Sequence, residues 1–359
     1  MRVGILGGGQ LARMLALAGR PLGLDFEILC PAPDACAAPL GHHRQAGFYD
    51  EEALRALAAS VDVVTYEFEN VPAETVAVLE GRVPVYPHPR ALAHAQDRLR
   101  EKTLFRELGI PTPPFAPVDD LAQLQAAVAE VGLPAVLKTR TEGYDGKGQF
   151  VLHEAGQVEA AWEAIGRVPA ILEGFVDYSR EVSILAVRGR DGEIRHYPLS
   201  ENTHEGGILR LSVARPGDPL QARAEELVRR LLERLDYVGV IALELFQVGD
   251  ELLANEFAPR VHNSGHWTIE GAEIGQFENH LRAVLGWPLG MTDPVGLAAM
   301  VNFIGRLPPA EAVLALPYTH FHDYGKAPRE GRKVGHATVR CPDAATRDRA
   351  IEALRGLIT

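Results

Sequence analysis

The chain has 359 residues and a formal net charge of −12, and 47% of its residues are hydrophobic, which suits a soluble globular protein of two or three domains. A chain this acidic is not expected to bind nucleic acid or an anionic membrane surface, because both partners require a basic face. It contains no apolar run near the roughly 18 residues of a membrane span, and MRVGILGGGQ enters a predicted strand without a leader pattern. Three cysteines without metal-ligand spacing further predict a cytoplasmic protein with reduced thiols.

The first part of the chain alternates between strand-like and helix-like segments. RVGIL runs into a glycine turn, FEILC forms a second strand, and VDVVTYEFEN forms a third with a polar end. Helical spacing appears between them in QLARMLALAGRPLG and EEALRALAAS. This alternation predicts an open, mostly parallel, Rossmann-like α/β sheet over residues 1–95. The proline-broken stretch 83–115, with one helix inside it, predicts a crossing into a second domain.

Residues 96–290 are expected to form a second domain of mixed α+β structure. An amphipathic helix at 121–134 precedes the strand AVLKT and a glycine-rich loop, and the strands AILEGFV and REVSILAVRG follow. After a helix at 224–237, VIALELFQV and ELLANEFA predict a hairpin that turns at Gly249 and Asp250. A small β-rich C-terminal domain is expected over 291–359.

Two glutamates in the predicted hairpin are candidate metal ligands. A three-residue loop ending at Glu251 would place Glu244 directly opposite Glu256, whereas a two-residue loop would pair Glu244 with Asn255. Facing carboxylates on a half-buried sheet repel each other unless a proton or a cation lies between them. Mg²⁺ suits such an oxygen-only pair, and it usually keeps water and phosphate oxygens as further ligands. The alternative is two solvated acids on an exposed face.

The loop around Lys147 is a candidate phosphate site. Lys138 ends a predicted strand, and Gly143, Gly146 and Gly148 punctuate the segment that follows it. Such a loop can turn its N–H groups toward phosphate oxygens while the lysines add positive charge. It is not a Walker A loop, because the spacing differs and no Ser or Thr follows the lysine. An ordinary glycine hairpin is the alternative.

The turn GGGQLA has the spacing of a dinucleotide-binding fingerprint, at Gly7, Gly9 and Ala12. A nicotinamide oxidoreductase would also need an acid at the end of the second strand to hold the ribose. That strand ends at Cys30, and the next acid is Asp34. We therefore expect the turn to serve another anion at its helix N-terminus, or merely to pack tightly.

The segment NEFAPRVHNSGHWT concentrates hydrogen-bonding groups just past Glu256. His262 and His266 have a spacing that on a helix would suit zinc, but the nearby proline and glycine disfavour a helix. Arg260, His262 and Asn263 instead predict a cup for a small oxyanion beside the metal. The segment GRKVGH is expected to present Arg332, Lys333 and His336 in one turn, with a solvated basic loop as the alternative.

Taken together, these segments resemble a known family. Lys138, the GYDGKGQ loop, ILEGFV, Glu181 and the acids of ALELF and NEFAPR follow the ATP-grasp pattern, in which two domains clasp ATP. Within that superfamily, nearly the whole chain resembles the N5-carboxyaminoimidazole ribonucleotide synthetase family. The segments that carry this resemblance are GGGQLARM, TYEFENVP, TEGYDGKGQ, YPLSENTHEGGILR, NEFAPRVHNSGHWT and GRKVGH.

The resemblance implies a reaction and its cofactors. Members of the family use ATP and Mg²⁺ to carboxylate the amine of 5-aminoimidazole ribonucleotide with bicarbonate, through carboxyphosphate, in purine biosynthesis. ADP and phosphate are released. The resemblance also implies a Rossmann-like N-terminal domain, an ATP-grasp domain with a mobile flap subdomain at about 112–178, a small C-terminal domain, and a homodimer.

The resemblance assigns residues to each part of this chemistry. Glu244 and Glu256 would bind Mg²⁺. The catalytic group comprises Tyr144, Asp145, Arg260, His262, Asn263 and Lys333, with Asp145 as the candidate base for the attacking amine. The ribonucleotide would be held by Gln10, Glu67, Glu69, Asn70, Arg332 and Lys333. ATP would be held by Arg98, Lys138, Gly143, Tyr144, Asp145, Gly146, Lys147, Gly148, Gln149, Glu173, Gly174, Phe175, Val176, Glu181, His204, Asn255 and Glu256.

Three alternatives remain at this point. An ATP-grasp ligase could act on another acceptor, such as glycinamide ribonucleotide or biotin. The turn GGGQLA could belong to a nicotinamide oxidoreductase. A catalytically silent regulator could bind ATP with Mg²⁺ and show no turnover that depends on an acceptor.

Overall fold

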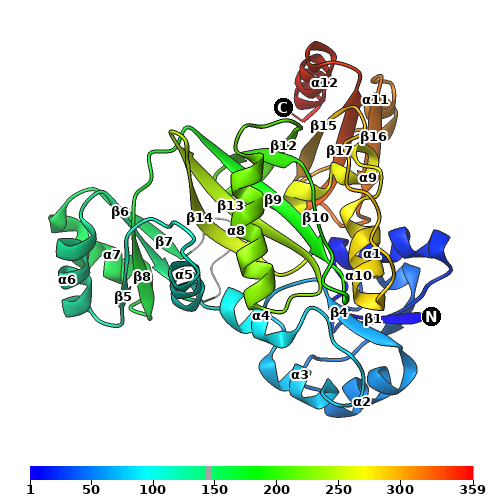
Figure 1. Ribbon diagram of the computed structural model, residues 1–359, viewed down its shortest axis with the longest axis horizontal. Helices are drawn as coiled ribbons and strands as arrows, with labels where there is room; N and C mark the ends of the chain where they lie inside the picture. The colour runs from blue at the N-terminus through cyan, green and yellow to red at the C-terminus, as the bar shows by residue number, and fades with distance from the viewer. Residues whose placement is uncertain (142–147, 359) are drawn as a thin grey trace.

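The computed structural model describes residues 1–141 and 148–358 (Figure 1). In this described part, the strands form a small parallel sheet near the N-terminus, a small antiparallel sheet and a long antiparallel sheet. The small antiparallel sheet lies in an outlying lobe with α6 and α7 (Figure 1). The mixed α/β class predicted from the sequence is confirmed. None of the helices in the described ranges combines the length and apolar character needed to cross a bilayer.

The N-terminal sheet has the strand order β3-β2-β1-β4, and all its pairings are parallel. Strands β1, β2 and β4 are largely apolar and buried because helices cover both faces, as parallel sheets require, whereas the short edge strand β3 is polar and partly exposed. The strands are β1 (Arg2–Leu6), β2 (Asp25–Leu29), β3 (His42–Arg44) and β4 (Val63–Tyr66). The helices are α1 (Gln10–Gly19), α2 (Glu51–Ser60) and α3 (Ala73–Leu79), with short 3₁₀ turns η1 (Arg20–Leu22) and η2 (Ala38–Leu40).

The crossing segment forms two helices, α4 (Pro89–Ala95) and α5 (Arg98–Glu107), where the sequence predicted one. That prediction is wrong because Asp97 starts a new helix. Its carboxylate accepts hydrogen bonds from the backbone N–H groups of Leu99 and Arg100, at 2.9 and 3.3 Å, and so caps α5. Arg140 binds the same carboxylate at 2.6 Å and ties the cap to the neighbouring lobe.

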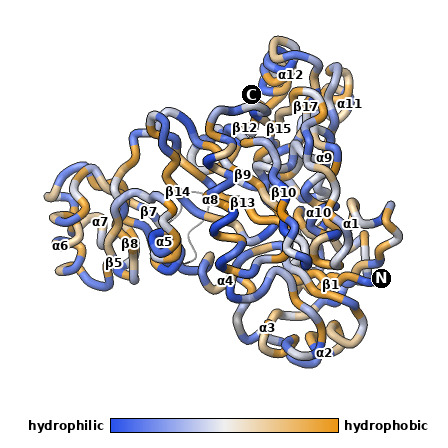
Figure 2. Tube along the Cα trace, viewed as in Figure 1, coloured by the Kyte–Doolittle hydropathy of each residue, from blue (hydrophilic) through white to orange (hydrophobic). Residues whose placement is uncertain are grey.

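The outlying lobe has the strand order β5-β8-β6-β7 and a hydrophobic core of its own. Hydrophobic and hydrophilic positions alternate along α6, as expected for a helix that buries one face (Figure 2). The strands are β5 (Phe115–Val118), β6 (Ala135–Thr139), β7 (Gln149–Leu152) and β8 (Ala170–Gly174). The helices are α6 (Leu121–Val131), α7 (Val158–Ala164) and the 3₁₀ turn η3 (Ala155–Gln157).

The long sheet has the order β14-β13-β9-β11-β12-β15-β17-β16, and β10 pairs with β9. Strands of the C-terminal segment extend this sheet through the pairing of β12 with β15. The strands are β9 (Arg180–Arg188), β10 (Ile194–His196), β11 (Leu199–Glu205), β12 (Ile208–Arg215), β13 (Gly239–Val248), β14 (Glu251–Ala258), β15 (Leu297–Ile304), β16 (Thr319–Asp323) and β17 (Lys333–Cys341). The helices are α8 (Gln221–Arg234), α9 (Thr268–Gly271), α10 (Gln276–Leu285), α11 (Ala310–Leu314), α12 (Ala344–Gly356) and η4 (Asn263–Gly265).

One prediction about the C-terminal segment is wrong. Lys333 and His336 do not share a turn with Arg332, because β17 begins at Lys333. The ring of His336 is fully buried and stacks on His322 with 4.3 Å between ring centroids, while Tyr324 Oη lies 2.8 Å from His336 Nδ1. Pairing with β15 and β16 on both sides buries this part of β17. The six-residue pattern alone contains no sign of that pairing.

Candidate active site

A cavity of about 670 Å³ lies where the three sheets meet. It opens at the carboxyl ends of β1 and β4, where open α/β sheets usually bind ligands. The lobe and the long sheet supply its other walls. The predicted site residues that line it are Gln10, Glu67, Glu69, Asn70, Arg98, Lys138, Gln149, Phe175, Glu181, His204, Glu244, Asn255, Glu256, Arg260, His262, Asn263 and Lys333.

The two candidate metal ligands face each other across the β13–β14 hairpin, as predicted, but by a different route. The turn has two residues, Gly249 and Asp250, since Val248 pairs with Glu251; of the two loop lengths considered above, this is the one that by itself would pair Glu244 with Asn255. A shift in register leaves Asn255 unpaired and brings Glu244 opposite Glu256. Such a bulge adds one residue to one strand. It therefore places Glu256 on the same face of the sheet as Glu244, which the two-residue turn alone would not do.

The electrostatics of this pair suit a cation. Burial, followed by the charge of Glu256, raises the pKa of Glu244 to about 7. Burial would also raise the pKa of Glu256, but Arg98 outweighs it and lowers that pKa, with its Nη1 2.8 Å from Glu256 Oε2. A divalent ion between the carboxylates would replace the proton that Glu244 otherwise retains.

The donor set also indicates which ion fits. Among residues 1–141 and 148–358, no three or more His, Cys, Asp or Glu side chains are grouped to hold a metal by themselves. Two carboxylates with room for phosphate and water oxygens match the way Mg²⁺ is bound beside nucleotides. His266 does not line the cavity with His262, because its ring is fully buried against Phe277 and His336. These positions give the zinc alternative no support.

A buried carboxylate holds two lysines beside the metal pair. Glu173 Oε2 lies 3.2 Å from Lys102 Nζ and 3.1 Å from Lys138 Nζ. Burial would raise the pKa of Glu173, but the two lysines lower it to about 2, so this acid is ionised. Lys138 reaches the cavity, whereas Glu173 does not line it. The role that the resemblance gave Glu173 in binding ATP remains a prediction.

Another pair of charged side chains faces the cavity from β9 and β11. His204 Nδ1 forms a close ion pair with Glu181, and the Tyr178 hydroxyl donates to the same carboxylate. Burial would lower the pKa of His204, but the hydrogen bond and charge of Glu181 outweigh it and raise that pKa. The pair therefore favours the protonated imidazole at this wall of the cavity.

The predicted oxyanion cup is assembled beside Glu244. Arg260 Nε lies 2.5 Å from Glu69 Oε2, so the N-terminal domain fixes this guanidinium. Burial and then the charge of Arg260 lower the pKa of His262 to about 3, which leaves its ring neutral. The amide of Asn263 exchanges hydrogen bonds with that of Asn302, at 3.1 and 2.7 Å.

A chain of buried hydrogen bonds fixes the tautomer of His262. The Ser212 hydroxyl donates to Asn202 Oδ1 at 2.6 Å, and Asn202 Nδ2 donates to Ser183 Oγ at 3.0 Å. Ser183 can then donate to Ser264 Oγ at 2.7 Å, and Ser264 can donate to His262 Nδ1 at 2.9 Å. The Ser264 backbone N–H donates to the same Nδ1 at 3.4 Å, so the ring proton is on Nε2, which lies 3.2 Å from a Glu244 oxygen at the edge of the cavity.

The glycine turn after β1 packs tightly against a glutamate of the protein itself, which is the second of the two alternatives expected for it. Glu67 accepts hydrogen bonds from the N–H groups of Gly9 and, at 3.0 Å, Ala12. A side chain at Gly7 would meet Glu67 Cγ at 2.4 Å, and its φ of +109° also requires glycine. Gln10 contacts Lys326. Since no ribose-binding acid follows β2, the nicotinamide alternative has no structural support.

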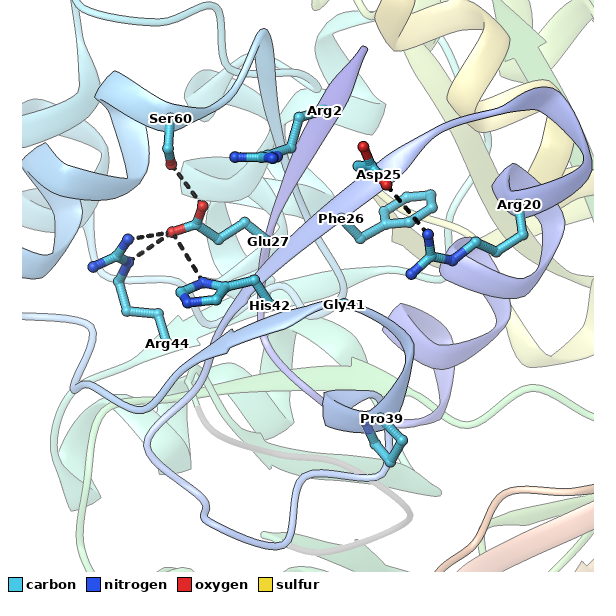
Figure 3. Close-up of a pocket in the computed structure, with 10 residues that line it drawn as sticks. All are labelled: Arg2, Arg20, Asp25, Phe26, Glu27, Pro39, Gly41, His42, Arg44 and Ser60. Atoms are coloured by element: carbon cyan, nitrogen blue, oxygen red, sulfur yellow. Dashed lines mark hydrogen bonds and ion pairs between the residues drawn. The ribbon is translucent and has the colours of Figure 1, made fainter.

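A second cavity, of about 470 Å³, lies at the amino ends of β1 and β2, far from the carboxyl ends that form the first cavity (Figure 3). Its buried acid, Glu27, is already bound by Arg44 Nε at 2.8 Å and Ser60 Oγ at 2.7 Å. The basic side chains nearby are bound by acids, Arg44 by Glu27 and Arg20 by Asp25. We assign this cavity no function.

Some predicted residues lie elsewhere. Gly148, Glu173, Gly174, Val176 and Arg332 do not line the first cavity, and Arg332 Nη1 donates to the Ala327 carbonyl at 3.1 Å. The residues of the central glycine loop lie outside the described ranges, so their assignments remain predictions. They are Gly143, Tyr144, Asp145, Gly146 and Lys147.

Sequence reasoning missed two charged residues on α5. Lys102 holds Glu173, and Glu101 lines the cavity and accepts a hydrogen bond from the Phe257 N–H at 2.7 Å. Burial and then the charge of Glu256 raise the pKa of Glu101 to about 8. The available signal was spacing, because Arg98, Glu101 and Lys102 are three and four positions apart and so lie on one helix face.

Three family models match consecutive parts of the chain. They describe a ribonucleotide synthetase preATP-grasp domain at residues 1–96, an ATP-grasp domain at 103–277 and a phosphoribosylaminoimidazole carboxylase C-terminal domain at 298–350. N5-carboxyaminoimidazole ribonucleotide synthase of Pseudomonas aeruginosa is 62% identical over 358 residues, which cover 100% of this chain and 99% of the relative. The Bacillus subtilis protein of the same name is 39% identical and covers 94% of this chain and 90% of its own length.

Solved structures agree. N5-carboxyaminoimidazole ribonucleotide synthetase from Thermus thermophilus matches with a TM-score of 0.96 and 57% identity, over 99% of this chain and 98% of the other. N5-carboxyaminoimidazole synthase from Aspergillus clavatus, solved with ADP and 5-aminoimidazole ribonucleotide, matches with a TM-score of 0.92 and 31% identity over the same shares. The resemblance found in the motifs is confirmed, and the chain belongs to the N5-carboxyaminoimidazole ribonucleotide synthase family of ATP-grasp ligases.

Proposed function

We propose that the first cavity carries out the family's reaction, the ATP-dependent carboxylation of the amine of 5-aminoimidazole ribonucleotide in purine biosynthesis, with bicarbonate as carbon source. The observation that carries this proposal is the position of the Glu244–Glu256 pair. It lies between cationic groups suited to phosphates, such as Lys138, and the cup that contains Arg260 and His262. The Aspergillus clavatus synthase, solved with ADP and this ribonucleotide, supports the choice of acceptor.

The nucleotide phosphates are assigned to the side of the cavity with Arg98, Lys138 and cationic His204. When bound by Glu244 and Glu256, Mg²⁺ would offset charge on the phosphoryl group during its transfer. Arg98 already lies against Glu256, so it approaches the phosphates together with the metal ligands. Glu173 keeps the Lys138 ammonium in place.

Bicarbonate is assigned to the cup formed by Arg260, His262 and Asn263. A guanidinium matches a small oxyanion in shape and charge, and the neutral His262 ring offers its Nε2 proton. A bicarbonate oxygen attacks the γ-phosphorus and ADP leaves, which forms carboxyphosphate. The amine of the ribonucleotide then bonds to the carboxyl carbon, phosphate leaves, and the amine proton passes to a base.

Asp145 is our candidate for that base, and it lies outside the described residues. Because carboxyphosphate hydrolyses readily, the residues about 112–178 are proposed to act as a flap that excludes water before it forms. Lys333 lines the cavity from the C-terminal side and is assigned to the ribonucleotide together with Gln10 and Glu69.

The arrangement of domains is also proposed. Residues 1–95 would form the Rossmann-like domain, 96–290 the ATP-grasp domain and 291–359 the C-terminal domain. We further propose a cytoplasmic homodimer, which gel filtration with light scattering would test.

ADP release tests the function directly. With ATP and Mg²⁺ present, omission of either bicarbonate or 5-aminoimidazole ribonucleotide should reduce ADP release to a low background. Glycinamide ribonucleotide and biotin should not replace the aminoimidazole. Stimulation by one of those acceptors would identify a different ligase, and tight ATP binding without any acceptor-dependent release would identify a silent regulator.

A further inference from the structure

A buried glutamine holds the backbone of the oxyanion cup. Gln276, at the start of α10, is fully buried and does not line the cavity. Its Oε1 accepts from the His262 N–H at 2.8 Å, and its Nε2 donates to the His262 carbonyl at 2.7 Å. One side-chain amide thus binds both backbone polar groups of a residue in the cup.

The surroundings fix the orientation of this amide. The His262 N–H is a donor, so the oxygen of the Gln276 amide must face it, and the NH₂ group must face the carbonyl. The same NH₂ lies 3.2 Å from His266 Nδ1, which therefore accepts and carries no proton. A flipped amide would place two acceptors together at both the carbonyl and His266.

The local sequence is built around the same contact. A side chain on Gly265 would meet Leu185 Cδ2 at 2.1 Å and Gln276 Nε2 at 2.9 Å, so glycine allows both side chains to approach the backbone here. The Gln276 N–H donates to Thr268 Oγ1 at 3.0 Å, and that hydroxyl donates to the Gly265 carbonyl at 2.7 Å. With the two contacts to His262 and the one to His266, four hydrogen-bond contacts of Gln276 connect the start of α10 to the segment that carries the cup.

We propose that Gln276 is a positioning residue for bicarbonate: its amide sets the backbone at His262 and thereby aims the Nε2–H of that ring into the cup. The inference rests on the proposed function, because it assigns His262 to bicarbonate. Gln276 reaches the reacting atoms only through His262. The nucleotide side of the cavity does not depend on it, since Lys138 and His204 lie on other elements, β6 and β11.

Asn279 supplies a matched control on the same helix. It is also fully buried, accepts from the Gly290 N–H at 2.7 Å and donates to the Gly290 carbonyl at 3.2 Å. Its amide therefore holds both polar groups of one backbone residue, as Gln276 does. Neither Asn279 nor Gly290 lines the cavity. Loss of either amide should destabilise the fold, but only Gln276 should affect the cup.

The test compares Gln276→Met with Asn279→Leu in the full-length protein, by ADP release and thermal unfolding. Gln276→Met should raise the KM for bicarbonate by about tenfold or more, the effect of about one lost hydrogen bond, while the KM for ATP stays within about twofold. Asn279→Leu should lower Tm similarly and leave the bicarbonate KM within about twofold. Equal effects of the two variants on the bicarbonate KM would overturn the inference.

Gln276→Glu gives a second readout in case Gln276→Met folds poorly. A protonated glutamic acid has one donor and one acceptor and can still bind both His262 groups, whereas a carboxylate cannot donate to the carbonyl. Burial favours the protonated form, so the bicarbonate KM of Gln276→Glu should approach the wild-type value at acidic pH and rise as pH increases. The inference would be contradicted if the ratio of the bicarbonate KM of Gln276→Glu to that of the wild type did not change with pH.

The two proposals fail in different ways. A wild-type protein whose ADP release ignores bicarbonate would overturn the proposed function. A wild-type protein that responds to bicarbonate, together with a Gln276→Met variant that behaves like Asn279→Leu, would overturn the positioning role alone.

Discussion

Glu244 lies directly opposite Glu256 across the β13–β14 hairpin, and unpaired Asn255 is what brings the two acids together. The two-residue turn alone would pair Glu244 with Asn255 and direct Glu256 to the other face of the sheet. The bulge at Asn255 shifts the register by one residue just before Glu256, so both carboxylates lie on the same face of the sheet. A local irregularity in β14 therefore creates the carboxylate pair on which the proposed chemistry depends.

Removal of the Glu244 carboxylate should abolish catalysis and change how stability depends on pH. The pKa of Glu244 is raised to about 7, first by burial and then by Glu256, so folding favours its protonated form. The contribution of Glu244 to the free energy of unfolding therefore falls as pH rises from the ordinary pKa of 4.5 through the raised pKa of about 7. Glu244→Gln should gain stability relative to wild type over that window, and its ADP release should fall about 100-fold or more.

Thermal unfolding without metal, at several pH values, measures the effect on stability. Mg²⁺ with ADP should raise the Tm of the wild type at alkaline pH and raise that of Glu244→Gln much less. A constant Tm difference between the two proteins across the pH range would show that Glu244 does not titrate as described.

Glu173→Gln should destabilise the protein more than Lys138→Met. The first change leaves the buried ammonium of Lys102 without its carboxylate, which costs roughly 3–5 kcal/mol by analogy with other broken buried ion pairs. The pKa of Glu173 is about 2, so its stabilisation is present above pH 4.5 and is lost as pH falls toward 2. Urea unfolding and ATP titration would separate the effects, because Lys138→Met should mainly weaken ATP binding. Equal stability of the two variants would refute the shared-carboxylate account.

Ser264→Ala should loosen the control of the His262 tautomer. The hydroxyl can donate to His262 Nδ1, and so it assists the Ser264 N–H, which donates to the same nitrogen at 3.4 Å and remains in the variant, in keeping the proton on Nε2. Without it, ¹⁵N NMR of labelled histidine should show a mixture of tautomers, and activity should fall about tenfold, the effect of one hydrogen bond. Ser200→Ala is a matched control, because Ser200 is buried too but binds Trp267 Nε1 at 2.8 Å. An unchanged His262 spectrum in Ser264→Ala would contradict the relay.

ATP affinity should fall with rising pH because of His204. Burial would lower its pKa, but Glu181 outweighs that effect and raises it, so the cation persists above the ordinary value of 6.5. The attraction to phosphate is present below that value and is lost as pH rises through the raised pKa. Isothermal titration of ATP across pH should show this loss in the wild type and a flatter profile in His204→Gln. The same pH dependence of ATP affinity in both proteins would show that His204 does not contribute to nucleotide binding.

Much of the fold could be predicted because the strands are apolar and short. VIALELFQV and ELLANEFA show clear alternation, and their turn at Gly249 and Asp250 was predicted. The bulge at Asn255, which makes their acids face each other across this two-residue turn, was not. The strand β11 was missed because SENTHE is polar, and its buried Asn202 finds its partner Ser212, on β12, only after the strands pair. The break between α4 and α5 was missed because Asp97 acts as a cap only in its local geometry.

Many residues that line the site could be predicted from the sequence, but the contacts that hold them in place could not. Arg260, His262 and Asn263 are adjacent in the chain, so their motif is visible in the sequence. Lys102 reaches Glu173, and Glu67 reaches Gly9, only through the packing of separate elements. No periodicity or spacing in a single sequence reports such contacts.

The location of the metal tests the central claim most directly. Crystals grown with ADP and Mn²⁺ in place of Mg²⁺ would reveal the ion by its anomalous scattering. The account predicts one peak that contacts carboxylate oxygens of both Glu244 and Glu256 beneath the nucleotide phosphates. A peak bound by other residues, or carboxylates that point to opposite sides of the sheet, would contradict it.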